Sequence, residues 1–291
     1  MKVVGRLPYE STAAPLTAPQ SWNGEPITVD IARGNIEVIG DPHATQLSVV
    51  GDAITWAQNA DDAGVISRAI LATAKIDHDA NGVRVTCQLV QGDFKSANPD
   101  ATQCNVRIVV PAPAGVTHDV HAYARDGFVY LQRLTTSATS HIVSTGIEVE
   151  ATQLKGNVEV HAGWTDVEVK PMPGSSVVVE STTDDWYSIP TLQEVPKREE
   201  RDGSAKFGAT VRLPQDFRAQ RVELSSAGAS VEATPFPDVV SGAPRGPLDA
   251  TAAQLVSVRA NQGNATLLVL DPTATGSRTT GLGKSEREAW E

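Results

Sequence analysis

Three histidines lie at a regular spacing that could serve metal binding. His121, His141 and His161 are each 20 residues apart, and neutral imidazoles are common ligands of transition metals. If the chain repeats with that period, the three side chains could stack as a ladder on an outer face, about 4.8 Å apart. Three unrelated surface histidines are the simpler interpretation, because a strand points any residue outward half the time. The ladder stays open, and we assign no metal site.

Alternating carboxylates offer a second chemistry. Glu148, Glu150, Asp166 and Glu168 could line one face, as the catalytic acids of β-helical polysaccharide-cleaving enzymes do. An acid–base pair needs one carboxyl with a raised pKa, and hence a cleft or a hydrophobic wall. This stretch has no long loops to build a cleft, so we interpret its carboxylates as solvated charges that oppose edge-to-edge aggregation. We assign no catalytic residue, and such an enzyme remains an alternative.

Aromatic residues make up only 5% of the chain, so their placement is informative. Phe128 and Tyr130 alternate with apolar residues, while Trp164 and Trp186 occur at or just after turns one and two repeats later. Large rigid side chains gathered on one face would suit a sugar ring or a protein partner. We predict that these four residues form a ligand or partner face. The alternative is that they cover strand ends or pack beneath a loop at 197–206.

The cysteines, Cys87 and Cys104, match neither a zinc-binding spacing nor a CxxC redox pair. Both are in phase with the apolar positions of strand-like segments. If these two segments pair as a hairpin, the sulfurs could face each other. A disulfide and two small core side chains both stay open.

The C-terminal text TGSRTTGLGKSE is similar to a phosphate-binding loop but fails its spacing. Gly276 and Gly281 fit the pattern, but Leu282 then occupies the lysine position and Lys284 comes too late. We therefore expect a flexible polar tail over 273–291 and no cofactor.

The composition limits the classes of partner that the chain can bind. The chain has 291 residues, of which 40% are hydrophobic, and so can bury a core. A formal net charge of -11 argues against a nucleic-acid partner, because affinity for phosphate backbones comes mainly from clustered Lys and Arg. The first 26 residues contain no long apolar run, so we expect an extended lead over 1–26 and no membrane span. A cytoplasmic protein and a mature secreted one both stay open.

Short strands dominate the predicted structure. The text ITVDIARGNIEVIGDPHATQLSVVG alternates with a period of two residues from Ile27 onward. One amphipathic helix is expected from about Asp61 to Ile76, with Asp61 and Asp62 capping its start and its apolar face on a sheet. Strand-like runs then continue to about Pro272. We predict a β-repeat domain over 27–272, with a possible subdivision near 197–206.

Apolar pairs that should face inward recur at a nearly constant step. They are Val129 and Leu131, Ile147 and Val149, and Val167 and Val169, with steps of 18 and 20, and Val158 and Val160, which recur 19 residues later as Val177 and Val179. A period near 19 is typical of a solenoid, in which each coil buries its apolar face against its neighbours and the ends need covers. The predicted helix could be one cover.

The residues VRIVVPAPAGVTHDVHAYARDGFVYLQRL and STGIEVEATQLKGNVEVHAGWTDVEVKPM resemble the β-strand repeat proteins grouped as DUF4097, related to the adhesin-like DUF2807 proteins with a head GIN domain. A weaker second copy is ATVRLPQDFRAQRVELSSAGASVEATPF, and the resemblance covers about 27–240. It implies a right-handed, single-stranded β-helix, export or attachment to the envelope, and no established chemistry.

The sequence therefore predicts an all-β, solenoid-like stack of short strands with one helix. We expect a non-enzymatic envelope or surface protein that binds or scaffolds, with a protein or glycan of the envelope as its partner. The alternative is a cytoplasmic, self-assembling β-solenoid similar to bactofilin.

Overall fold

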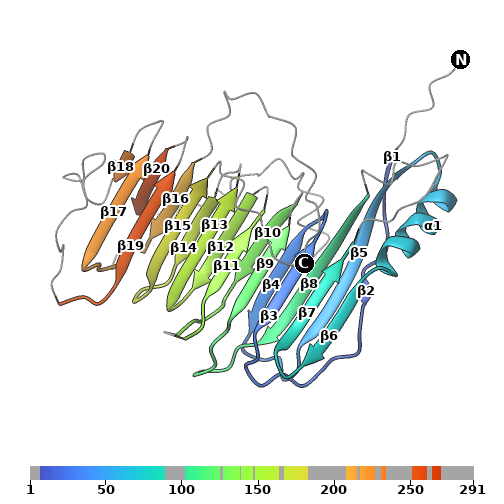
Figure 1. Ribbon diagram of the computed structural model, residues 1–291, viewed down its shortest axis with the longest axis horizontal. Helices are drawn as coiled ribbons and strands as arrows, with labels where there is room; N and C mark the ends of the chain where they lie inside the picture. Colours follow the sequence, from blue (N-terminus) through green and yellow to red (C-terminus); the bar gives the residue numbers. More distant parts are fainter. Residues whose placement is uncertain are drawn as a thin grey trace, which may run out of the picture.

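The computed structural model of the chain describes residues 7–88, 102–124, 127–137, 139–146, 148–163, 167–182, 208–214, 217–226, 231–233, 251–260 and 264–269. Over these residues the protein is all-β with one helix, as the sequence predicts (Figure 1). The expected tail and the possible subdivision near 197–206 lie outside these ranges.

The strands form two sheets. Sheet 1 holds β1 (Leu7–Glu10), β2 (Ala14–Pro15), β4 (Ile36–Asp41), β5 (Ser48–Ala57), β8 (Gln103–Pro111), β10 (Phe128–Gln132), β12 (Glu148–Leu154), β14 (Val167–Pro171), β16 (Ala209–Leu213), β18 (Val231–Ala233) and β20 (Ala265–Val269). Sheet 2 holds β3 (Ile27–Ile31), β6 (Lys75–Asp79), β7 (Gly82–Cys87), β9 (Val120–Ala124), β11 (Ile142–Thr145), β13 (Asn157–Gly163), β15 (Ser176–Thr182), β17 (Arg221–Ser226) and β19 (Leu255–Ala260).

From β7 onward, successive strands alternate between the two sheets. Each strand from β11 to β16 pairs in parallel with the strand two places earlier in the chain. Two consecutive strands therefore add one strand to each sheet. We call two such consecutive strands a pass. Among the described strands, antiparallel pairing is confined to the N-terminal end, where β5 joins β8, β6 joins β7, and β1 and β2 join β5. Both sheets are therefore mixed.

The described passes are not stacked in chain order at either end. The pass β3–β4 lies between β7–β8 and β9–β10, and the pass β19–β20 lies between β15–β16 and β17–β18 (Figure 1). An early strand at one end and a late strand at the other are therefore enclosed by neighbours on both sides.

Inward side chains are stacked in register between passes. In sheet 2, Val158 and Val160 pair with Val177 and Val179, as the step of 19 predicts. These valines are at most 1% exposed. Burying each one contributes about 1.5–3 kcal/mol, and the branched side chains suit strands that are covered on their inner face.

One predicted register in sheet 1 is wrong by two residues. Val129 pairs with Val149 and Leu131 pairs with Ala151, so the inward pair on β12 is Val149 and Ala151. The expected pair included Ile147, which lies outside the described residues. The larger side chain gave Ile147 the stronger hydrophobic signal, whereas the small Ala151 fills the inward position and is fully buried.

The helix α1 spans Ala60–Leu71 and so ends earlier than predicted. The chain turns after Leu71 because Ala72 already caps the helix, and Ile76 belongs to β6. The predicted cap is also wrong. The side chain of Asn59 accepts a hydrogen bond from the Asp62 backbone N–H, and Asp62 lies in the first turn, where a carboxylate favours the positive end of the helix dipole.

The helix packs on β5 at the N-terminal end of the stack (Figure 1). Ala63 and Ile66 lie against Ala57, while Ile70 joins the main core between the sheets. Val65, which lies beside Ile66 in the helix, is 51% exposed. Among the described residues, no helix has the length and apolarity needed to cross a membrane.

Cys87 and Cys104 form a disulfide, one of the two arrangements that the sequence left open. The predicted condition for it, a hairpin between the two segments, is not met. Cys87 ends β7 in sheet 2, whereas Cys104 lies on β8 in sheet 1. The disulfide therefore joins the two sheets across the core.

Glycines allow the corners of successive passes to lie close together. Gly34, between β3 and β4, has a φ of +128°, and a Cβ there would lie 2.1 Å from the backbone oxygen of Cys104. Gly156, between β12 and β13, has a φ of +97° and is equally close to the Thr136 backbone oxygen. Only glycine combines this backbone conformation with this contact.

Candidate binding surfaces

Phe128 and Tyr130 project together from the outer face of sheet 1. They alternate along β10 with Val129 and Leu131, which are buried in the core. The two rings are stacked, with centroids 6.5 Å apart and an angle of 24° between their planes. Both side chains are half-buried. The predicted pair therefore forms a compact aromatic unit in the interior of the sheet.

An asparagine row positions Phe128. The Phe128 N–H donates to Asn35 Oδ1 at 3.2 Å, and the Asn35 N–H donates to Asn105 Oδ1 at 3.0 Å. Asn105 Nδ2 in turn donates to Asp52 Oδ2 at 2.8 Å. The row thus crosses from β5 through β8 to β10. It ties the start of β10 to three neighbouring segments of the sheet.

Asp52 ends this row as a buried carboxyl group. Burial raises its pKa to about 6, although the hydrogen bond from Asn105 acts in the opposite direction. Its Oδ1 atom is buried and has no hydrogen-bond partner. With 6% exposure, Asp52 is not presented to a substrate, so its raised pKa concerns stability and not acid catalysis.

Charged residues flank the aromatic pair on both sides. Tyr130 lies in register with Glu37 on β4 and Glu150 on β12. Glu37 forms an ion pair with Arg107, and Glu150 forms one with Lys170 at 3.3 Å. The pair Phe128 and Tyr130, with these charges around it, is called here the partner face.

Glu168, which lies beside Glu150 on the next strand of sheet 1, is also held by cations. Glu168 lies 2.9 Å from Lys170 Nζ and 2.9 Å from Arg212 Nε. Burial acts to raise the pKa of Glu168, but Lys170 and Arg212 outweigh it, and the pKa lies below its ordinary value. A lowered pKa does not suit a general acid at neutral pH. The prediction that Glu168 is merely solvated is also wrong, because its side chain is only 17% exposed.

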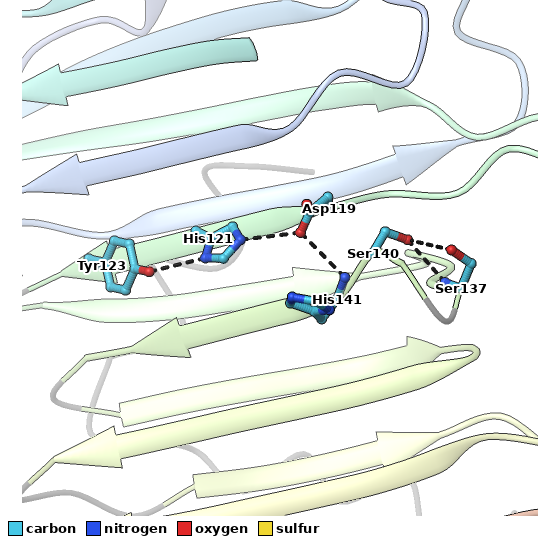
Figure 2. A network of polar contacts seen from close by, with 6 residues as sticks. All are labelled: Asp119, His121, Tyr123, Ser137, Ser140 and His141. Atoms are coloured by element: carbon cyan, nitrogen blue, oxygen red, sulfur yellow. Dashed lines mark hydrogen bonds and ion pairs between the residues drawn. The ribbon is translucent and has the colours of Figure 1, made fainter. Parts of the chain in front are cut away.

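A second polar group lies on the outer face of sheet 2 (Figure 2). Asp119, His121 and Tyr123 alternate along β9 and its approach, and so share one side of the strand. His121 Nε2 lies 3.2 Å from Asp119 Oδ1, and its Nδ1 lies 3.1 Å from the Tyr123 hydroxyl. In the neutral imidazole, Nε2–H donates to the carboxylate and the Tyr123 hydroxyl donates to Nδ1.

His141 completes this group from the next pass. Its backbone N–H donates to Asp119 Oδ1 at 3.3 Å, and its ring meets that of His121 edge-on, with centroids 6.2 Å apart (Figure 2). The four residues Asp119, His121, Tyr123 and His141 are called here the Asp119 cluster. Burial raises the pKa of Tyr123, and the charges of Asp30 and Asp119 raise it further, so the phenol stays neutral.

The three evenly spaced histidines do not form a ladder. Val120 pairs with Ile142, so the residue beside His121 is Val143, and His141 lies at the preceding corner. His161 instead contacts Glu159 at 2.6 Å and Glu180 at 3.3 Å. Within the part of the chain that the structure describes, no three His, Cys, Asp or Glu side chains are grouped so as to hold a metal ion.

The four predicted site residues are only partly placed. Phe128 and Tyr130 lie together, whereas Trp164, Trp186 and Asp166 are outside the described residues, as is the side chain of Glu148. Sequence reasoning missed the Asp119 cluster. Its signal is the text DVHAY, which places three polar or aromatic side chains on one side of a strand.

No family model matches the sequence, and no curated protein matches it. Among solved structures, the chain is similar to a "putative cell adhesion protein" from Clostridium sporogenes, with 12% identity and a TM-score of 0.45 over 91% of this chain and 100% of that one. It is also similar to a "putative adhesin" from Parabacteroides merdae, with 9% identity and a TM-score of 0.27 over 89% and 97% of the two chains. Both likenesses are remote, and neither shows the function of this chain.

Proposed function

We propose that the chain is a non-enzymatic β-repeat module of the bacterial envelope or surface, which binds or scaffolds as an adhesin does. Its partner is a protein or glycan of the envelope. The observation that carries the proposal is the stacked pair Phe128 and Tyr130.

The partner face has the composition of an interaction surface. Large rigid aromatic side chains supply most of the energy of an interface, and surrounding charges supply specificity. Here the asparagine row holds the backbone at the start of β10 and the two rings stack on each other, which reduces the conformational entropy lost on binding. Its neighbours Glu37 and Glu150 are each already paired with a cation, which leaves a defined charge pattern around the rings.

We further propose that the β-repeat domain over 27–272 contains a right-handed, single-stranded β-helix of the DUF4097 type, formed by the consecutive passes from β9 to β16. Parallel strands such as β12 and β14, joined through a strand of the other sheet, support this assignment. A crossover connection between parallel strands of one sheet is right-handed in the great majority of proteins.

The disulfide supports a place outside the cytoplasm. Bonds such as that between Cys87 and Cys104 form and persist in oxidising compartments and are rare where thiols are kept reduced. This favours the envelope protein over the cytoplasmic, self-assembling solenoid.

The proposal is tested by binding of the labelled full chain to peptidoglycan sacculi and to envelope vesicles. We expect saturable binding to one of them, weakened tenfold or more by Tyr130→Ala, because loss of an aromatic hot spot costs about 2 kcal/mol or more. Thr210→Ala is the matched control, since Thr210 lies in register with Glu168 on the same outer face.

Two results would overturn the proposal. One is binding of Tyr130→Ala that equals binding of the parent on both preparations. The other is cleavage of a polysaccharide by the parent that disappears in Glu168→Gln, which would make the face an active site.

A further inference from the structure

The Asp119 cluster is preorganised on a part of the surface other than the partner face. Hydrogen bonds hold His121 between Asp119 and Tyr123, and Asp119 in turn receives the backbone N–H of His141 (Figure 2). Three side chains of the cluster therefore have fixed rotamers before any ligand arrives. Binding to such a group loses little side-chain entropy.

The cluster also has unused hydrogen-bonding capacity. Both contacts of the Asp119 carboxylate use Oδ1, so Oδ2 remains able to accept. Tyr123 uses its hydrogen toward His121 and keeps its lone pairs. His141 is exposed, and its ring makes an edge contact with His121 but no hydrogen bond among the described residues. The group thus presents acceptors and an imidazole that can donate or accept.

Ring surfaces lie beside these polar atoms. The centroids of His121 and Tyr123 are 6.3 Å apart and those of His121 and His141 are 6.2 Å apart, with angles of 39° and 72° between the ring planes, so the three rings are adjacent but not coplanar. The hydroxyls of Ser137 and Ser140 lie at the adjoining corner and bond to each other at 3.1 Å (Figure 2). Flat rings next to mixed donors and acceptors fit a molecule with an apolar face and a rim of hydroxyl groups.

Charge separates this ligand class from others. An anionic ligand would be repelled by Asp119 and by Asp30, which lies in register with Tyr123. An organic cation would bind best to a carboxylate that has no other hydrogen-bond donor nearby. Asp119 instead already accepts hydrogen bonds from a histidine and a backbone N–H. A neutral polyhydroxyl ligand carries no charge that the cluster would have to compensate. It can form hydrogen bonds with Asp119 Oδ2, the Tyr123 hydroxyl oxygen and the His141 ring.

We propose that the Asp119 cluster is a binding site for a neutral oligosaccharide. The hydroxyls of the sugar would donate to Asp119 Oδ2 and Tyr123 and exchange hydrogen bonds with His141, while its C–H face would lie on one of the three rings. The Tyr123 phenol stays neutral, which fits a binding role and not that of a phenolate nucleophile. The site does not depend on the partner face of sheet 1.

The test is saturation-transfer NMR on the full chain, with cello-, xylo-, manno- and chito-oligosaccharides as probes. We expect transfer to at least one of the four, reduced at least fivefold in His141→Ala and in Asp119→Asn. The asparagine can still accept from His121 through its oxygen, but it presents a donor where Oδ2 accepted. Thr210→Ala, on sheet 1 and outside both surfaces, should leave the transfer unchanged. Because the proposed function is read from binding of Tyr130→Ala to sacculi and vesicles, its failure is distinguishable from failure of this site.

Two outcomes would overturn the assignment. One is the absence of transfer to all four sugars, in which case transfer to methylguanidinium would make the cluster a cation site. The other is transfer that survives both variants. Since the His141 side chain is exposed and makes no hydrogen bond among the described residues, an unchanged melting temperature of His141→Ala serves as the folding control.

Discussion

Trp22 and His118 stack face to face in the core, with centroids 5.5 Å apart and an angle of 9° between their planes. His118 is fully buried, and its two ring nitrogens lie 3.1 Å from the Pro111 oxygen and 3.0 Å from the Thr135 nitrogen. Because Thr135 N–H donates to Nδ1, the hydrogen of the ring is on Nε2 and is donated to Pro111. The histidine therefore joins two corners and is a structural residue.

His118 should make the protein less stable at mildly acidic pH. Burial lowers the pKa of His118, so the unfolded chain takes up a proton near pH 6.5 while the folded chain does not. Stability from this residue is present above that pH and is lost as the pH falls, by up to about 1.4 kcal/mol per pH unit.

Urea unfolding at pH 7.5 and pH 5.5 tests this effect. We expect the parent to lose more stability between the two than His118→Gln does, with exposed His43→Gln as the control that keeps the parent's difference. Equal losses in the parent and His118→Gln would contradict the prediction.

Asp52→Asn should stabilise the protein at neutral pH. The pKa of Asp52 is raised to about 6 by burial, so the folded state holds the proton that the unfolded state releases near pH 4. The residue therefore costs stability progressively as the pH rises from about 4 to 6, reaching on the order of 2 kcal/mol. The asparagine variant should gain that amount at pH 7.5 and little at pH 4, by denaturant unfolding. Asp77→Asn, exposed on β6, should gain nothing, and a gain at pH 4 as large as that at pH 7.5 would refute the mechanism.

Adjacent substitutions on β14 should differ strongly. Val167 is 1% exposed between Val149 and Ala209, so Val167→Asp would bury an unpaired charge and cost several kcal/mol or prevent folding. Glu168→Ala points outward but removes the common partner of Lys170 and Arg212, and should cost about 1 kcal/mol. Melting temperatures and soluble yield compare the two, and similar values would mean that the strand faces are assigned in reverse.

Removal of the disulfide should lower stability without changing the fold. The cysteines are 17 residues apart, and a loop of that size corresponds to about 3 kcal/mol of unfolded-state entropy. The double variant Cys87→Ser with Cys104→Ser should therefore melt several degrees lower than the parent, and reductant should lower the parent alone. Full alkylation of both thiols in denaturant without reductant would show that no disulfide forms.

The alternation of valines is enough to predict the β architecture and most strand faces, because each side of a strand has one environment. The alternation did not predict the register of β12. Ala151 carries little hydrophobic signal, although its position opposite Leu131 is set by the neighbouring strand. The end of the helix was also missed, because apolar spacing continues into Ile76 while a new strand begins there.

The two surfaces differ in how far the sequence predicts them. Phe128 and Tyr130 come from one strand, so their common side follows from local alternation. The Asp119 cluster needs His141, 22 residues after Asp119, to reach it from the next pass. The even spacing of the histidines suggested a ladder instead. The ladder does not form because the corners between strands differ in length, so residues at a constant sequence spacing do not stay in register. The asparagine row likewise unites residues as far apart as Asn35 and Phe128.

The interleaved ends decide how the described stack can come apart. β17 pairs with β19 and β18 with β20, so strands synthesised later hold earlier ones in place. Among the described strands, unzipping cannot release the passes in reverse chain order, because β19 and β20 lie inside β17 and β18 in the stack. At the other end, β3 and β4 must wait for partners on both sides, so that end closes only after β10 has left the ribosome. Linear repeat arrays assemble one repeat at a time and fray at their ends. The interleaved order of this stack makes assembly slower, and it makes the separation of β19 and β20 from their neighbours harder.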